Sequence, residues 1–185
     1  MATIVGIAGS LRRSSYNAAL LRAAATLAPP ELTIEIASIR DIPLYDGDLE
    51  AADRMPEVVA SLKDRIAQAD GLLLVTPEYN SSLPGVFKNA IDWLSRPAGD
   101  IPRVFGKKPV ALMGATTGRG GTALAQAAWL PVLRYLGTQP WFGPRLSVAA
   151  AKSVFDANGN LVDREITRLV RTYMAGFAEF LNRAG

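Results

Sequence analysis

Residues 71–94 read GLLLVTPEYNSSLPGVFKNAIDWL, and this stretch decides the fold class. Its first six residues form a nearly continuous apolar run, which is typical of a strand buried on both faces of a parallel sheet. A polar loop follows, and Pro84 then opens a helical pattern that places Phe87, Ile91 and Leu94 on one face. A buried strand, a polar loop and an amphipathic helix in succession indicate an α/β protein.

The same alternation runs along the rest of the chain. Strands are expected over 3–8, 32–39, 71–76 and 109–115, with a fifth within 140–148, and helices over 17–27, 57–69, 84–94, 121–136 and 163–182. Pro131 should kink or divide the fourth of these helices. The longest irregular stretch, 40–55, is a turn-rich loop of a kind that is often functional. Five strands alternating with five helices predict a three-layer α/β sandwich, formed by a single domain over 1–185.

The composition excludes several kinds of chemistry. The chain has no cysteine and no histidine, which excludes thiolate catalysis, cysteine-ligated metals and Ser-His-Asp triads. We therefore expect no metal site and no catalytic side chain, and a cofactor should supply the chemistry. The net charge of +3 is modest and the basic residues are scattered, which argues against a nucleic-acid partner. No apolar run suits membrane insertion and the N-terminus does not resemble a signal peptide, so we expect a cytoplasmic protein.

Ligands of open α/β sheets bind beyond the carboxyl ends of the strands, so the loops after the first, third and fourth strands form the candidate site. The first loop, 9–17, leads into a helix and offers amides, hydroxyls and two guanidinium groups without an acidic residue, as expected of a phosphate site. It lacks the Walker A and G-x-G-x-x-G patterns, and the second strand is followed by Arg40 rather than an acid. Of the phosphate ligands, a monophosphate such as that of FMN therefore fits this loop best. The alternative is that the loop is an ordinary turn in which Ser15 or Asn17 caps the helix.

The other two loops suit a flat ligand. The second, 76–85, carries two prolines that should hold it extended, with polar residues where a planar ring can dock; alternatively, it only caps the next helix. The third, 114–122, is rich in glycine, which lets a backbone approach a ring, and in threonine, which can donate to carbonyl oxygens. Three polar loops at one edge predict a site for a ligand with a phosphate and a planar ring.

These residues resemble the NAD(P)H-dependent FMN reductase family, which includes bacterial chromate and quinone reductases and some azoreductases. The resemblance rests on GSLR at 9–12 with Ser15 and Asn17, PEYN at 77–80, PG at 84–85 and KNAIDWLSR at 88–96. DIPLY at 41–45 and the Gly-Gly pair after the fourth strand extend it over most of the chain. Some relatives have an arginine soon after that pair, where this chain continues Thr122-Ala123-Leu124. The resemblance implies a flavodoxin-like fold with strand order 2-1-3-4-5.

The resemblance also implies roles for individual residues. The FMN phosphate should be held by Ser10, Arg12, Ser15 and Asn17, with backbone groups or packing from Leu11, Ser14 and Tyr16. The edge of the isoalloxazine ring should be lined by Pro77, Glu78, Tyr79, Asn80 and Ser81. The pyrimidine end and the ribityl chain should be approached by Thr116, Thr117 and Gly118.

The implied function is an FMN-dependent reductase. NADPH or NADH would pass a hydride to the flavin, and a quinone, chromate, an azo compound or free flavin would then take two electrons in a ping-pong cycle. Arg12, Arg13 and Arg119 are candidates for binding the 2′-phosphate of NADPH. A homodimer or homotetramer is implied, with the helices that begin at Pro84 and Gly121 as the candidate interface.

Two other functions remain open from the sequence. One is a flavodoxin-type electron carrier that binds FMN without oxidising NAD(P)H, although such carriers usually present an acidic surface and this chain is basic. The other is an α/β binding or signalling domain without flavin. A receiver domain would need an acidic cluster after the first strand, where this chain has Ala8-Gly9-Ser10.

Overall fold

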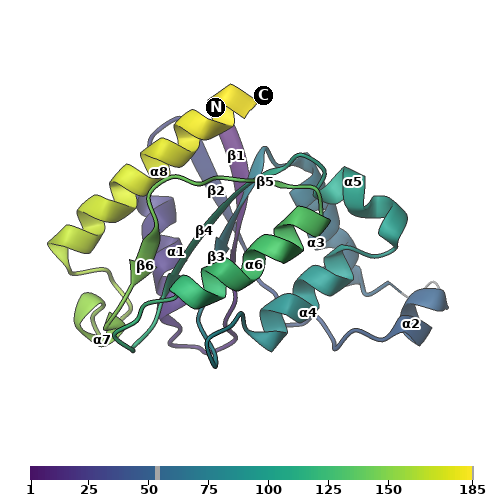
Figure 1. Cartoon of the computed structure of the whole chain (residues 1–185), viewed down its shortest axis with the longest axis horizontal. Helices are drawn as coiled ribbons and strands as arrows, with labels where there is room; N and C mark the ends of the chain where they lie inside the picture. The colour runs from purple at the N-terminus through teal and green to yellow at the C-terminus, as the bar shows by residue number, and fades with distance from the viewer. Residues whose placement is uncertain (53–54, 185) are drawn as a thin grey trace.

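The computed structural model describes residues 1–52 and 55–184, and a parallel β-sheet runs through its centre (Figure 1). Its four full strands are β1 (Ala2–Ala8), β2 (Leu32–Ala37), β3 (Gly71–Val75) and β4 (Pro109–Ala115). Two short strands, β5 (Gln139–Pro140) and β6 (Leu146–Val148), both pair with β4 and share the fifth position. The order β2-β1-β3-β4-β5 confirms the predicted flavodoxin-like topology.

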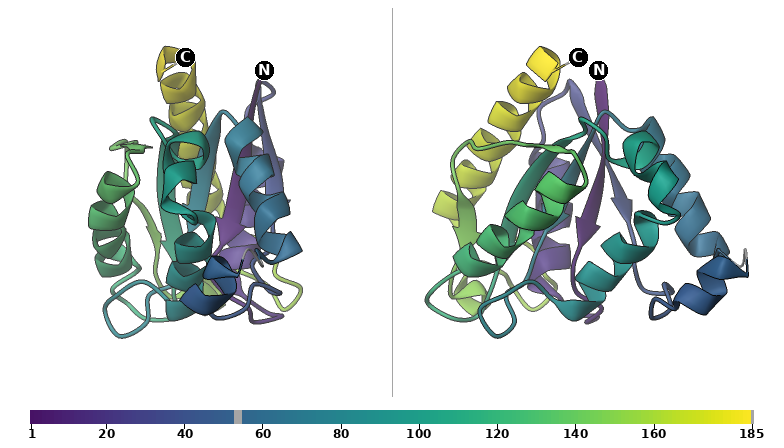
Figure 2. Two further views of the ribbon diagram at one scale, coloured as in Figure 1. Left: turned by 90° about the vertical axis from the view of Figure 1, so that its right-hand side faces the viewer. Right: turned by 45° about the vertical axis from the view of Figure 1, so that its right-hand side comes forward.

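All strand pairs are parallel, so the carboxyl ends of the strands lie at one edge of the sheet. β3 lies at the centre, and all five of its residues are buried, as its continuous apolar run predicts. Figures 1 and 2 show the carboxyl ends and their loops at the lower edge of the molecule, with both termini at the opposite edge. Polar loops of distant sequence position therefore gather at a single edge.

The helices cover both faces of the sheet (Figure 2). One buried cluster joins the sheet to α1, α7 and α8, and a second joins it to α3, α4, α5 and α6. The helical elements are α1 (Tyr16–Leu27), α2 (Gly47–Ala51), α3 (Glu57–Gln68), α4 (Gly85–Leu94), η1 (Ala98–Asp100), α5 (Ile101–Val104), α6 (Ala123–Tyr135), α7 (Ala151–Val154) and α8 (Arg164–Ala184). Within the described ranges, no helix is both long and apolar enough to cross a membrane.

The five predicted helices are confirmed to within two residues at each end. Of the two outcomes expected at Pro131, division of the helix does not occur, because α6 continues to Tyr135 as one helix. Pro131 and Ala127 both lie on the exposed side of α6, so water can bond the Ala127 carbonyl that loses its intrahelical partner. The cost of the proline is therefore small enough for the packed face of the helix to outweigh it.

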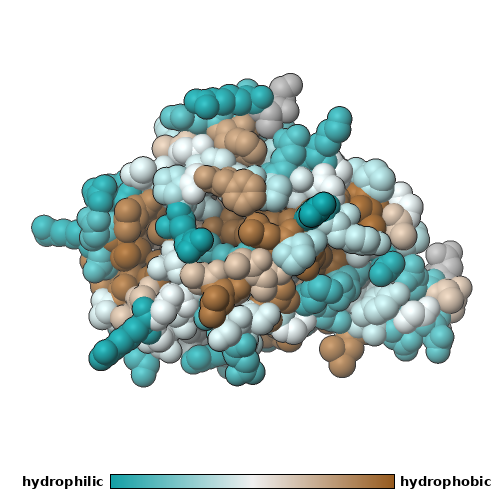
Figure 3. Space-filling view, viewed as in Figure 1, coloured by the Kyte–Doolittle hydropathy of each residue, from teal (hydrophilic) through white to brown (hydrophobic). Residues whose placement is uncertain are grey.

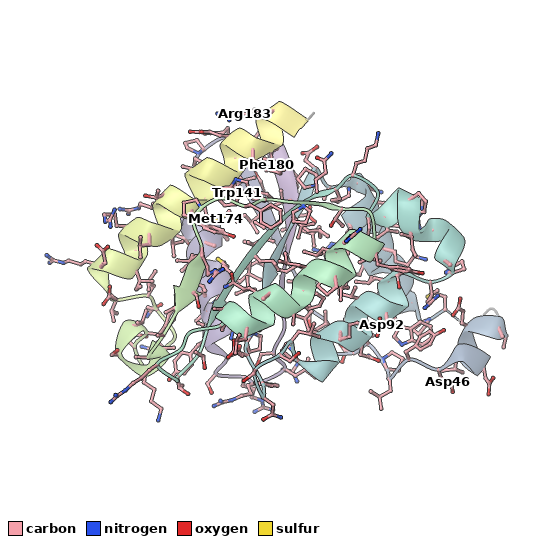
Figure 4. All side chains as sticks on the ribbon, viewed as in Figure 1. Asp46, Asp92, Trp141, Met174, Phe180 and Arg183 are labelled. Atoms are coloured by element: carbon pink, nitrogen blue, oxygen red, sulfur yellow. The ribbon has the colours of Figure 1, made fainter. Side chains whose placement is uncertain are left out.

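The fifth strand position is divided because residues 142–145 leave the sheet, after the Trp141 amide has donated a 2.8 Å hydrogen bond to the Val110 carbonyl of β4. Pro144 has no N–H to donate to a ladder, and the Trp141 ring turns onto α8, where its centroid lies 4.9 Å from that of Tyr173 (Figure 4). The Tyr173 hydroxyl donates a 2.6 Å hydrogen bond to the Leu112 carbonyl of β4. A side chain of α8 therefore occupies a ladder position between β5 and β6.

Candidate functional site

The loops after β1, β3 and β4 meet at the carboxyl edge of the sheet, as the sequence predicts (Figure 2). The chain leaves β1 toward β2 on one side of the sheet, whereas β3 and β4 lie on the other side. This reversal of strand order is the topological switch point at which open α/β sheets bind ligands. The candidate site is therefore the edge formed by residues 9–17, 76–84 and 116–122.

A buried aromatic pair supports two of these loops from below. A Cβ atom on Gly9 would lie 2.1 Å from Cδ1 of Phe87 on α4, so only glycine lets the first loop rest on this ring. Phe87 packs edge-on against Trp129 of α6 with the ring centroids 4.9 Å apart. Trp129 Nε1 donates a 3.2 Å hydrogen bond to Oγ1 of the fully buried Thr76, where the second loop begins. The first and second loops therefore share one rigid base, whose aromatic members belong to no predicted site.

The first loop presents free donors at the start of α1. The Ser15 hydroxyl caps the helix by accepting a 3.2 Å hydrogen bond from the Ala18 amide. The amides of Tyr16 and Asn17 donate to no acceptor among the described residues, so both are available to an anion. Together with Arg12, which is exposed in the same loop, these amides form a donor set that fits a phosphate group.

The side chain of Asn17 also joins α1 to the end of β4. Its Nδ2 donates to the Ala115 carbonyl at 2.8 Å, and its Oδ1 accepts from the Ala115 amide at 2.9 Å. Both residues are buried. This arrangement leaves the backbone amide of Asn17 and one N–H of Nδ2 for a phosphate. The sequence placed Asn17 in the site but gave no sign of this second contact.

The second loop folds into a tight turn, so the expectation of an extended loop is wrong. Tyr79 and Ser82 exchange two backbone hydrogen bonds of 3.0 Å. Asn80 and Ser81 between them have φ of 51° and 61°, and positive φ at both central residues defines a type I′ turn. Asparagine adopts this conformation more readily than most residues. The turn leaves Tyr79 48% exposed.

Glu78 connects the second loop to the third. Its Oε2 accepts hydrogen bonds from the amides of Leu124 and Ala125 at 2.9 and 3.0 Å. These amides begin α6, whose N-cap residue Thr122 makes no side-chain cap bond. A carboxylate is favourable at a helix N-terminus because the helix dipole is positive there. The side chain of Glu78 is thus a positioning group, and its backbone is the part left for the ring edge.

The third loop is held from the side of β6. Thr116 donates its amide to the Val148 carbonyl at 2.9 Å, and its own carbonyl accepts from the Ala151 amide at 2.9 Å. The Gly118 amide turns back to Thr116 Oγ1 at 3.3 Å, and Thr117 is exposed between them. The loop therefore presents short side chains and backbone to the site from a fixed frame.

Ser147 of β6 completes this frame, although no motif in the sequence pointed to it. Its hydroxyl accepts a 2.6 Å hydrogen bond from the Thr122 amide. Gly121 has φ of 66°, and a Cβ there would lie 2.2 Å from Ser147 Oγ. The second glycine of the Gly-Gly pair is therefore required by the backbone conformation and by close packing.

Known proteins match both the sequence and this geometry. The family model described as NADPH-dependent FMN reductase matches residues 2–153. The chain belongs to this family. A 2-hydroxy-1,4-benzoquinone reductase of Burkholderia sp is 42% identical over 178 residues, covering 96% of this chain and 95% of the relative. An NAD(P)H-dependent FMN reductase of Pseudomonas aeruginosa is 42% identical over 180 residues, covering 97% of this chain and 95% of the relative.

A solved structure agrees with the sequence relatives. FerB, a flavoenzyme NAD(P)H:(acceptor) oxidoreductase from Paracoccus denitrificans, superposes with a TM-score of 0.89 at 35% identity and covers 100% of both chains. Family membership makes this FMN reductase family protein an oxidoreductase that uses FMN and NAD(P)H. The free amides of α1 and the glycine-lined approach at the loops fit that cofactor.

Proposed function

We propose that the protein oxidises NAD(P)H and reduces a small acceptor such as a quinone by a ping-pong mechanism. One observation carries the proposal: the phosphate donors of the first loop and the turn of the second loop lie over one aromatic base, and Glu78 joins the third loop to them. When bound, FMN supplies a redox centre that takes a hydride from NAD(P)H and returns two electrons to the acceptor. The chain itself would bind the cofactor, align the reactants with it and stabilise its reduced form.

The first loop would anchor the phosphate. The amides of Tyr16 and Asn17, the hydroxyls of Ser10 and Ser15 and the guanidinium of Arg12 are the proposed donors, with Leu11 and Ser14 completing the loop. Hydrogen bonds to a charged group contribute about 1.5–3 kcal/mol each. Micromolar binding needs about 8 kcal/mol, so a few such bonds and one ring contact suffice.

The second and third loops would hold the ring. Backbone groups of Pro77, Glu78, Asn80 and Ser81 would face its edge, and the exposed Tyr79 would pack against it. The hydroxyls of Thr116 and Thr117 would donate hydrogen bonds to its polar end, and Gly118 would let the backbone approach it. Fixed donors aimed at the place where negative charge develops favour reduction because they need no reorganisation.

The test is an anaerobic titration of the FMN-reconstituted protein with NADPH, followed by the visible absorption of the flavin. We expect stoichiometric bleaching that a quinone reverses, and parallel double-reciprocal plots in steady state. Binding of FMN without bleaching by NADPH or NADH would instead indicate an electron carrier. A protein that fails to bind FMN would contradict the proposed phosphate site.

A further inference from the structure

A separate cavity of about 360 Å³ lies beside the first loop, on the side of β2. It lies between the ends of β1 and β2 and one face of α1, and its volume is in the range of small-molecule sites. Its buried lining is apolar and includes Leu21, Ala37 and Ile39. Its exposed lining contains four arginines, Arg12, Arg13, Arg22 and Arg40.

The charge of this cavity is uncompensated. No carboxylate lines it, and none of its four guanidinium groups forms an ion pair with an acidic residue in 1–52 or 55–184. Arginines elsewhere do find such partners: Arg103 Nη1, for example, lies 2.9 Å from Asp64. Unpaired guanidinium groups around a concave apolar surface are suited to a phosphate-bearing ligand with a hydrophobic part.

Two tethers fix the positively charged side of the cavity. Arg40 Nη2 donates a 2.5 Å hydrogen bond to the Leu11 carbonyl of the first loop. The Arg40 amide donates to Ser38 Oγ at 3.1 Å, which leaves the Ser38 hydroxyl proton free for a ligand. The end of β2 and the proposed phosphate loop are thus held together by the residue that carries the charge.

The position of Arg40 is informative. In parallel α/β sheets that bind dinucleotides, an acid just after the second strand binds the ribose 2′-hydroxyl of NAD, whereas an arginine there accommodates the 2′-phosphate of NADP. Here β2 is followed by Ser38, Ile39 and Arg40. Arg40 therefore has the position and the charge that a 2′-phosphate requires, although the start of α1, which binds the pyrophosphate in those sheets, is assigned here to the FMN phosphate.

The guanidinium of Arg22 turns away from this cavity, since a Cβ atom on Gly159 would lie 3.0 Å from its Nη2. We propose that the cavity binds the adenosine end of NADPH through its 2′-phosphate, and that Arg13 and Arg40 give the protein a preference for NADPH over NADH. The inference rests on the proposed function, since it assumes that the nicotinamide end reaches the flavin site. Ser10, Leu11 and Arg12 line the cavity and also belong to the first loop of that site. A dinucleotide that crosses this loop contacts both places.

The cavity is tested by calorimetric titration of the FMN-loaded protein with 2′,5′-ADP, 5′-AMP and inorganic phosphate. We expect 2′,5′-ADP to bind at least about tenfold more tightly than the other two probes, and we expect Arg13→Gln and Arg40→Gln each to weaken its binding about tenfold. Arg171→Gln is the matched control, because Arg171 is exposed on α8 and has no ion pair within the described chain. Equal binding of the three probes, or unchanged binding in both variants, would overturn the proposal.

Steady-state kinetics separate this inference from the proposed function. Arg40→Gln should raise KM for NADPH about tenfold and KM for NADH less than about twofold. Added salt should weaken the binding of NADPH but not that of NADH. Equal effects on both nucleotides would refute the 2′-phosphate contact. If neither nucleotide reduces the flavin, the proposed function fails, and the 2′,5′-ADP titration still decides the cavity. If Arg40→Gln loses FMN, the Arg13→Gln variant decides, because Arg13 lines the cavity and is not among the proposed donors to the FMN phosphate.

Discussion

The side chain of Asn17 joins two segments of the site through a single residue, Ala115. Both partners are buried, so Asn17→Ala leaves the amide and carbonyl of Ala115 without hydrogen bonds. We expect the free energy of unfolding to fall by about 2–4 kcal/mol, measured by urea denaturation without FMN. The control Asn182→Ala, on the exposed side of α8, should change it by less than about 0.5 kcal/mol. An equally small loss for Asn17→Ala would contradict the proposed structural role.

Glu78 permits a similar test, because its carboxylate caps α6. Glu78→Ala should lower the free energy of unfolding by about 1 kcal/mol and weaken FMN binding, since the second and third loops are no longer connected. Glu78→Gln keeps an acceptor oxygen and should therefore lose less stability and less FMN affinity than Glu78→Ala. Denaturation and FMN fluorescence titration measure the two effects, with Glu179→Ala in a surface ion pair as the control. Loss of FMN affinity at full stability would make the carboxylate a direct ligand instead.

These two residues show what sequence reasoning can and cannot reach at this scale. Both belong to motifs, so the sequence named them as candidates for the site. Asn17 and Ala115 are 98 positions apart, and Glu78 and Leu124 are 46 apart. A motif gives the chemical groups that a site contains, but it does not say which of them bind ligand and which hold the frame. Ser147, which belongs to no motif, was missed altogether.

Secondary structure elements were predicted well where many residues of a segment favour the same structure. The apolar run of β3 and the periodic face of α4 left little choice, and both are confirmed. The short helices α2, α5 and α7 contain five, four and four residues, which is too few to show a helical period, and all were missed. In α8, Val170 and Met174 take the inward positions, and Leu169 is 37% exposed.

The contact between the first loop and α4 can be tested by a double-mutant cycle. Gly9→Ala places a methyl group against Phe87, so we expect the free energy of unfolding to fall by about 1–3 kcal/mol, with weaker FMN binding. Phe87→Leu removes the ring that causes the clash. The losses of unfolding free energy in the two single variants should therefore add up to more than the loss in the double variant. Strict additivity would show that the loop does not rest on this ring.

Tyr173 links α8 to β4 and predicts a pH dependence. Burial raises the pKa of its phenol well above the ordinary value of about 10. The unfolded chain releases this proton above pH 10 while the folded protein keeps it, so the stability contribution is complete below pH 10 and is lost as the pH rises toward the folded pKa. The slope approaches about 1.4 kcal/mol per pH unit.

Tyr173→Phe should cost about 1 kcal/mol at pH 7, through the lost bond to Leu112, and should then lose less stability than the wild type above pH 10. Urea denaturation between pH 7 and 11 measures both effects. Tyr135→Phe is the control, since Tyr135 is 74% exposed and its replacement should leave the profile parallel to that of the wild type. A parallel profile for Tyr173→Phe would contradict the predicted shift.

The whole molecule separates its polar and apolar surfaces. The arginines of the first loop and of the arginine-lined cavity lie at the carboxyl edge of the sheet, where the proposed ligands carry negative charge. Figure 3 shows apolar residues gathered on the face between α6 and α8, where Leu130, Trp141 and Phe142 line a further cavity. Val86 on α4 and Tyr135 on α6 are also exposed. Exposed apolar surface of this extent favours self-association.

We expect a homo-oligomer whose interface includes the outer faces of α4 and α6. Val86→Glu with Tyr135→Glu places two charges in that interface, where unpaired burial is costly, so the mass measured by light scattering after size exclusion should fall to that of a smaller assembly. Val162→Glu is the control, because Val162 is 56% exposed just before α8. A monomeric wild type would contradict the expectation. An unchanged mass in the double variant, with dissociation by Phe142→Glu, would move the interface to the apolar face between α6 and α8.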